Sequence, residues 1–146
     1  MKFSTKTRYG VRAILEIAMY NSAEGIYQKE IAQNQDISYK YLDQIMNSLK
    51  LAGLITKAAG PKRGYILTRK PSEITVYDIH LAFEPGICVI DCMAPDFSCN
   101  RDKFCSLKGF WGKLNNHIVD YFKSTTIEHL MEEQVKLDDL VKFQQQ

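Results

Sequence analysis

The order of apolar patterns in the first 70 residues constrains the fold more than any other feature of this chain. Two stretches, 7–21 and 38–52, repeat apolar residues three and four positions apart, as amphipathic helices do, and a short helix that buries Ile31 and Ala32 is expected between them over 28–35. Ser38 is suited to cap the start of the third helix, and Gly53 is suited to end it in the left-handed conformation. The pattern predicts three helices around one small core.

Two short apolar runs, 54–56 and 65–67, follow the third helix. The segment between them carries Gly60, Pro61 and Gly64, which favour a turn, and its tip is basic. Three helices followed by a basic hairpin indicate a winged helix-turn-helix. The side chains expected to be buried in the three helices are Val11, Ile14, Leu15, Ala18, Met19, Ile31, Ala32, Leu42, Ile45, Met46 and Leu49.

The second half predicts further helices, which makes the fold class mainly α. Thr75 to Asp78 can form a capping box for a fourth helix that Pro85 and Gly86 end. A fifth helix is expected over 109–123, and a cap at 125–128 predicts a short sixth helix before a frayed tail. We therefore divide the chain into a winged helix-turn-helix region (1–70), a linker helix with a cysteine loop (71–108), and a dimerisation helix with its tail (109–146).

The charges are divided between the two halves of the chain. Residues 1–70 carry 12 Lys and Arg against 5 Asp and Glu, a net charge of +7, whereas residues 71–146 carry 7 against 12, a net charge of −5. The first half can therefore face a polyanion such as double-stranded DNA, and the second half is poorly suited to do so. A solvated basic surface without a partner is the alternative interpretation.

The predicted third helix and the hairpin carry the candidate DNA-binding residues. On the third helix, Gln44 and Asn47 can pair with adenine, and Lys40 can reach guanine or phosphate. Asp43 is unusual on this face because a carboxylate is repelled by phosphates. Three interpretations are open: it accepts a hydrogen bond from a cytosine amine, it orients a neighbouring side chain, or it only moderates the surface charge. The candidates are Lys2, Lys6, Arg8, Ser38, Tyr39, Lys40, Asp43, Gln44, Asn47, Lys62 and Arg63, with Arg12 as a further phosphate contact.

The predicted fifth helix has an apolar face that is wide for a helix near the end of a chain. Trp111, Leu114, Ile118, Tyr121 and Phe122 lie on that face. We expect it to form a homodimer, which would match a pseudo-palindromic operator. The alternative is that the helix folds back on its own domain.

All four cysteines of the chain, Cys88, Cys92, Cys99 and Cys105, lie within 18 residues. The N-terminus has no signal-peptide core and no stretch is long enough to span a membrane, so a cytoplasmic protein with reduced thiols is expected. Clustered thiols then favour a metal centre or redox chemistry. A structural zinc site and a small buried apolar group are the alternatives.

Several segments resemble the Rrf-type winged-helix transcription regulators, which include members of the IscR, NsrR and CymR kinds. The segments are Met1 to Ala13, Glu30 to Ala32, Ile37 to Gln44, Leu51 to Ile55, and Arg63 to Tyr65, with the cysteine loop and Trp111 in the same order. The resemblance extends to about Leu130. It implies a homodimer with crossing C-terminal helices, and an iron–sulfur cluster on Cys92, Cys99 and Cys105. CymR-type members lack this triad and respond through a partner enzyme.

The chain departs from the family pattern at the fourth ligand. IscR-like members have a histidine where this chain has Lys108, and NsrR-like members can use an aspartate near the position of Arg8. Cys88 is the strongest local candidate because thiolate suits iron. Weaker candidates are His80, His117, Asp91, Asp102 and an oxygen of the partner subunit. The spacing between Cys92 and Cys99 is one residue longer than in IscR-like members, and both two-iron and four-iron clusters remain open.

These patterns predict a transcriptional regulator whose DNA binding depends on the state of an iron–sulfur cluster, on redox state or on nitric oxide. They do not predict an enzyme. The sequence has no nucleophile elbow, phosphate loop or paired carboxylates, although a cysteine–histidine pair is conceivable. A protein-interaction module without DNA binding would leave the exposed face of the third helix and the hairpin without a role.

Overall fold

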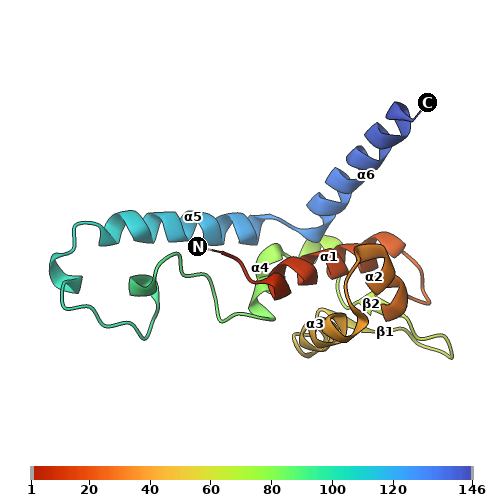
Figure 1. The fold of residues 1–146 in the computed structure, drawn as a ribbon, viewed down its shortest axis with the longest axis horizontal. Coiled ribbons are helices and arrows are strands. Elements are labelled where there is room, and N and C mark those ends of the chain that lie inside the picture. The colour runs from red at the N-terminus through yellow and green to blue at the C-terminus, as the bar shows by residue number, and fades with distance from the viewer. Residues whose placement is uncertain (1, 146) are drawn as a thin grey trace.

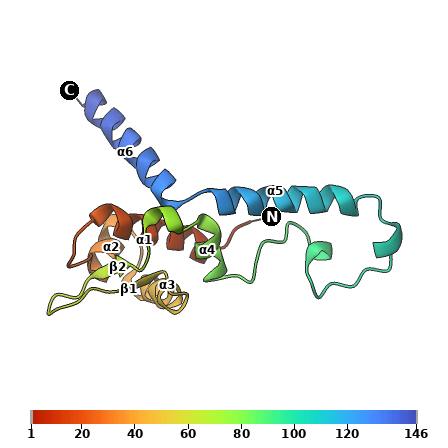
Figure 2. The ribbon, with the colours of Figure 1, turned by 180° about the vertical axis from the view of Figure 1, so that it is seen from behind.

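The computed structural model describes residues 2–145. In this part of the chain the elements are α1 (Thr5–Tyr20), α2 (Gln28–Gln35), α3 (Tyr39–Leu51), β1 (Ile55–Lys57), β2 (Tyr65–Leu67), α4 (Val76–Leu81), α5 (Lys108–Ser124) and α6 (Ile127–Gln144). Short 3₁₀ turns lie at Pro71–Glu73, Asp91–Met93 and Asp102–Phe104. Helices α1 to α4 and the sheet form one body, from which α5 with the cysteine loop and α6 extend in different directions (Figures 1 and 2). No helix within residues 2–145 has both the length and the apolar character needed to cross a membrane.

The core lies between α1, α2 and α3, and the hairpin, α4 and the start of α6 complete it with Ile55, Tyr65, Ile79 and Ile127. The buried faces predicted for α2 and α3 are confirmed, since Ile31, Ala32, Leu42, Ile45, Met46 and Leu49 are all buried. For α1 the prediction is partly wrong. Its buried face contains Ala13, Ile14, Ile17 and Ala18, whereas Val11, Leu15 and Met19 are only half-buried. Leu15 and Met19 instead line hollows between α1 and α6, because the long α6 covers a second side of α1.

The predicted helix caps are confirmed. Ser38 accepts a hydrogen bond from the backbone N–H of Tyr41, and Thr75 and Asp78 form the expected capping box of α4. Gly53 has a φ of 72°, so it ends α3 in the left-handed region that glycine favours. Helix α4 ends at Leu81, earlier than predicted, because the N–H groups of the next residues bond back to carbonyls of its last turn.

The hairpin is anchored to the connection between α1 and α2. Strands β1 and β2 pair antiparallel, with β1 one residue later than predicted. Tyr65 of β2 also pairs with Ile26 through two backbone hydrogen bonds of 2.7 and 3.1 Å. A Cβ atom on Gly64 would lie 2.3 Å from the carbonyl carbon of Gly25, so this contact requires glycine. The base of the wing is therefore held against the helical core.

The prediction of a short sixth helix with a frayed tail is wrong. Helix α6 has 18 residues and continues to Gln144. Thr126 caps it, Ile127 is fully buried, and the N–H of Ile127 donates to the carbonyl of Ile74. Leu130 and Met131 in the next turn are partly buried against the core, and beyond them good helix formers such as glutamate, leucine and lysine propagate the helix.

Most of helix α5 extends away from the body that α1 to α4 and the sheet form (Figure 1). None of its 17 residues is fully buried, and its C-terminal part contacts α4 (Figure 1). The alternative in which this helix folds back on its domain is met only at its C-terminal end, where the ring of Phe122 stacks on Phe3 with the centroids 4.9 Å apart.

Candidate nucleic-acid interface and cysteine loop

Helix α3 presents a polar face opposite its buried stripe. Because the buried residues fall three and four positions apart, the intervening residues point outward. The exposed residues of this face are Ser38, Tyr39, Lys40, Asp43, Gln44, Asn47 and Lys50. These include all the candidates predicted on α3. Their side chains are therefore accessible to DNA bases if α3 enters a major groove.

Asp43 is tied to two neighbouring amides. The Nε2 atom of Gln28 donates to Asp43 Oδ1 at 3.1 Å, and Nδ2 of Asn47 donates to Asp43 Oδ2 at 3.4 Å. Of the interpretations left open by the sequence, this geometry supports the one in which Asp43 orients a neighbour. Gln28 is a residue that the sequence analysis missed, because nothing in the sequence signals a contact between the start of α2 and α3.

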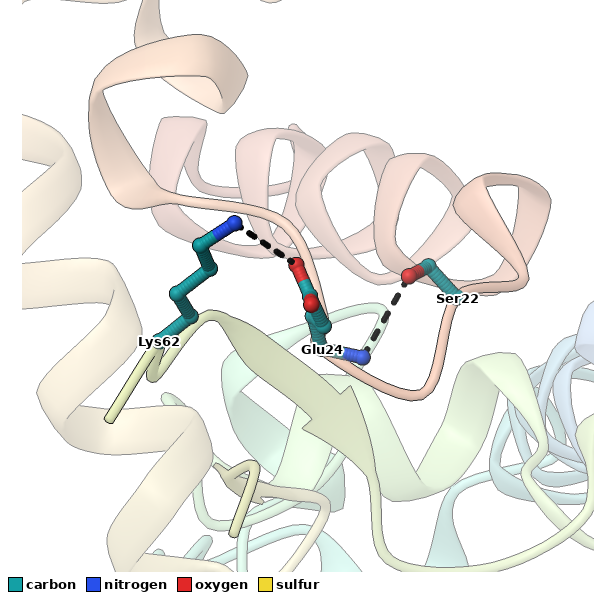
Figure 3. A network of polar contacts seen from close by, with 3 residues as sticks. All are labelled: Ser22, Glu24 and Lys62. Carbon is teal, nitrogen blue, oxygen red and sulfur yellow. Dashed lines mark hydrogen bonds and ion pairs between the residues drawn. The ribbon is translucent and has the colours of Figure 1, made fainter. Parts of the chain in front are cut away.

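The wing carries Lys62 and Arg63 at its exposed tip. Lys62 Nζ lies 4.0 Å from Glu24 Oε2, and Ser22 Oγ accepts from the backbone N–H of Glu24 (Figure 3). Arg63 Nε donates to the carbonyl oxygen of Gly60 at 3.0 Å. Exposed ion pairs contribute little to stability, so Lys62 remains free to exchange Glu24 for a phosphate.

Two hairpin residues add to this interface, and the sequence analysis did not select either of them. Lys57 Nζ lies 3.8 Å from the ring centroid of Tyr65. Burial lowers the pKa of Lys57, and the positive charge of Lys50 lowers it further. Burial raises the pKa of Tyr65, as do the nearby Asp43 and Tyr39. The base of the wing therefore lies beside α3, which strand β1 contacts.

The basic residues near the N-terminus differ in whether their side chains already bind other residues of the chain. Lys2, Lys6 and Arg8 are exposed, as phosphate contacts must be. Arg12 is instead engaged within the chain, because its Nε donates to Gln35 Oε1 at 3.0 Å and its Nη2 donates to the Gln35 carbonyl oxygen. Arg12 therefore ties α1 to the end of α2.

The cysteine loop has little regular structure. Cys88, Cys92, Cys99 and Cys105 are all exposed free thiols, which contradicts the alternative of a small buried apolar group. Cys92 and Cys99 line one hollow of about 680 Å³. Within residues 2–145, however, no three His, Cys, Asp or Glu side chains converge as a metal site would require.

Of the positions considered for a fourth ligand, Asp102 lines this hollow together with Cys92 and Cys99. Cys88 lines a different hollow of about 520 Å³, beside His80. Lys108 does line the first hollow, but its Nζ donates to Asp102 Oδ1 at 2.5 Å. This bond raises the pKa of Lys108, and the nearby Cys105 and Cys92 raise it further. A protonated Lys108 has no lone pair to offer a metal.

His80 is a buried junction between distant segments. Its Nδ1 lies 3.1 Å from Thr7 Oγ1 of α1, and its Nε2 donates to the carbonyl oxygen of Gly86 at 3.0 Å. Its ring lies edge-on to Phe3 and to Phe122 of α5. Both ring nitrogens are occupied, so His80 is not available as a ligand. It links the start of the cysteine loop to α1 and α5.

Replacing His80 with leucine is expected to lower the free energy of unfolding by about 1–3 kcal/mol. The half-buried Gly86 carbonyl would lose its hydrogen bond to the imidazole, and the buried Thr7 hydroxyl would keep only Ser4 as a side-chain partner. Urea unfolding followed by circular dichroism measures this change. His117→Leu, on the exposed side of α5, is the matched control and should shift the value by less than about 0.5 kcal/mol. Equal stability of wild type and His80→Leu would contradict the prediction.

Comparison with known proteins gives a consistent result. A family model described as "Rrf2: Iron-dependent Transcriptional regulator" matches residues 3–133. Protein rrf2 of Nitratidesulfovibrio vulgaris is 35% identical over 131 residues, which cover 90% of this chain and 87% of that protein.

Solved structures of two kinds resemble the fold about equally well. CymR, the global cysteine regulator of B. subtilis, gives a TM-score of 0.74 at 29% identity and covers 91% of this chain and 98% of that one. T. potens IscR gives a TM-score of 0.72 at 31% identity and covers 92% and 88%. The fold is thus that of the winged-helix regulators, and these likenesses do not distinguish between the two kinds.

Proposed function

Because the chain belongs to the Rrf2 family of transcriptional regulators, we propose that it is a DNA-binding homodimer that carries an iron–sulfur cluster on Cys92, Cys99 and Cys105. One observation carries the proposal. A single chain joins an exposed polar helix face with a basic wing to a loop that bears these three exposed thiols. The protein would therefore act as a regulator whose loop reports a chemical signal, and not as an enzyme.

The DNA-binding part of the proposal rests on α3, the wing and the N-terminal basic residues. Gln44, Asn47 and Lys40 are the base-reading candidates, because their side chains lie exposed on one helix face. Lys62 and Arg63 would contact the adjacent groove or backbone, and Lys2, Lys6 and Arg8 would contact phosphates without reading sequence.

The homodimer rests on the exposed apolar face of α5. Leu114 lies four residues after Phe110 and seven before Tyr121, so the three share one side of the helix, and they are 37%, 59% and 70% exposed, respectively. A helix that exposes such residues in an isolated chain needs a partner surface. A second copy related by two-fold symmetry would cover it and would place two α3 helices on a pseudo-palindromic operator.

The cluster part rests on the chemistry of the donor set. Three thiolates in one accessible loop suit iron–sulfur ligation, and Cys92 and Cys99 already share a hollow. A bound cluster would supply sensitivity to iron supply, redox state or nitric oxide. The fourth ligand remains to be assigned among Cys88, an oxygen donor of this chain and a donor of the partner subunit.

The loop is connected to the DNA-binding region through His80. Rearrangement of residues 88–107 on ligation would act on Gly86, whose carbonyl His80 holds, and His80 in turn contacts Thr7 at the start of α1. A coupling free energy of about 1–3 kcal/mol would change operator affinity roughly 5–150-fold.

A cluster-independent thiol regulator is the second candidate. It is favoured by the absence, within residues 2–145, of three side chains that converge as metal ligands. Exposed thiols can be oxidised reversibly, which also changes loop conformation. A structural zinc site is a third possibility for the same thiols.

The test is anaerobic isolation followed by iron, acid-labile sulfide and zinc analysis and Mössbauer spectroscopy. The proposal expects iron and sulfide in stoichiometric amounts, and the spectrum distinguishes two-iron from four-iron forms. Metal-free protein that resists reconstitution would favour the thiol regulator, and stoichiometric zinc would favour the structural site. Binding to random duplex DNA in a salt series tests the DNA-binding part separately, since phosphate contacts make affinity fall steeply with salt.

A further inference from the structure

Gln28 is a buried amide directed at the polar face of α3. It is the first residue of α2, and only 7% of its surface is exposed. Its Nε2 donates to Oδ1 of Asp43 at 3.1 Å, while Asp43 itself is exposed. A hydrogen bond to a charged acceptor is stronger than one between neutral groups. The buried amide therefore restrains a carboxylate that faces solvent.

The restraint extends one helical turn further along α3. Asp43 Oδ2 accepts from Asn47 Nδ2 at 3.4 Å, so the three side chains form a chain from the interior to the surface. One N–H of the Asn47 amide is used in this way, which leaves its second N–H and its carbonyl oxygen free. Each Asp43 oxygen also keeps a lone pair that can accept from a ligand.

Asp43 also lies near the base of the wing. Tyr65 of β2 is 8% exposed, and the charge of Asp43 contributes, after burial, to raising the pKa of the Tyr65 phenol. The carboxylate thus lies among α2, α3 and the base of the wing. A carboxylate on this face repels phosphates. It can strengthen DNA binding only by accepting a hydrogen bond from a donor group on a base, and a fixed orientation favours such a bond.

We infer that Gln28 is a positioning residue for base recognition. It holds Asp43, and through Asp43 also Asn47, in the orientation in which the pair presents acceptors to an amine in the major groove. In the major groove, cytosine is the base that presents only a hydrogen-bond donor, its N4 amine. This inference rests on the proposed DNA-binding function. It names a residue outside the recognition helix that sets base preference at one operator position.

The simpler alternative is that Gln28 only ties α2 to α3. An apolar side chain of similar length would fill the same space without burying an amide. Gln28→Met therefore separates the two roles, because it keeps the shape of the side chain and removes the hydrogen bond. Gln33→Met makes the same change on the exposed side of α2 and is the matched control.

The experiment is selection of bound duplexes from a random-sequence DNA pool by the full-length, anaerobically purified protein, followed by sequencing. Wild type is expected to select a motif with two half-sites. Gln28→Met should lose base preference at one position in each half-site by roughly fivefold or more, as expected when a good base contact is lost. Asp43→Ala should lose the same position, and Gln28→Met should add nothing in the Asp43→Ala background. Melting temperature and affinity for random duplex should stay close to wild type in Gln28→Met.

Each contrary outcome is distinct. An unchanged motif for Gln28→Met overturns the inference. So does a uniform loss of preference at all positions together with a lowered melting temperature, because that result indicates a purely structural tie. If wild type binds no duplex even at low salt, the proposed DNA-binding function fails first, and this inference fails with it.

Discussion

Cys99→Ala protein, isolated without oxygen, is expected to contain no stoichiometric iron or acid-labile sulfide and to be colourless. Cys99 lies between Cys92 and Cys105 in the loop, and it shares the larger hollow with Cys92. An iron–sulfur cluster with this donor set needs all three thiolates, and alanine offers no donor in place of the lost one. Because Cys99 is exposed, the variant should keep the circular dichroism and the melting temperature of cluster-free wild type.

The matched control is Ser98→Ala, which changes the preceding exposed residue of the same hollow and should retain full iron. Cys88→Ala then addresses the fourth ligand. Loss of iron in Cys88→Ala would assign that role to Cys88, and retention would direct the search to an oxygen donor or to the partner subunit. Full iron content in Cys99→Ala would remove Cys99 from the ligand set and contradict the proposed site.

Leu114→Asp is expected to convert the dimer to a monomer and to weaken operator binding by roughly 100-fold or more. Leu114 lies on the outward apolar side of α5 with Phe110 and Tyr121. In a two-fold interface the substitution appears twice, and each carboxylate would be buried without a partner. A monomer contacts one half-site only, so it loses most of the specific binding free energy.

Analytical ultracentrifugation and operator titration measure the two effects of Leu114→Asp. Asn116→Asp introduces the same charge two residues later on the helix, at an exposed position that points elsewhere, and should leave the dimer intact. A dimeric Leu114→Asp protein would show that the interface lies on another surface. A monomer with unchanged operator affinity would instead separate dimerisation from DNA binding.

The prediction of local elements succeeded where a residue's own chemistry decides the conformation. Ser38 and Thr75 cap helices because their side-chain oxygens accept from backbone N–H groups that any helix start leaves free. The buried stripe of α3 was predictable because that helix packs on one side only. The stripe of α1 was predicted less well, because α6 covers a second side of it, and a single periodic stripe does not describe a helix packed on two sides.

The candidate site was likewise predictable only where residues close together in the sequence determine it. The polar face of α3 followed from its periodicity, and the four cysteines could be read directly from the sequence. The hydrogen bond from Gln28 to Asp43 joins residues 15 apart, and the link from His80 to Thr7 joins residues 73 apart. No local pattern carries information about such pairs.

By itself, the sequence determined that this protein has three helices, a basic hairpin, further helices and a cluster of thiols, because helix caps, turn residues and periodic burial act over a few neighbouring positions. Only the tertiary structure decided that His80 joins α1 to the cysteine loop, that Asp43 is restrained from α2, and that α5 stands uncovered. Those features depend on which surfaces meet when the whole chain packs, and the free energy of packing is shared among residues that are distant in the sequence.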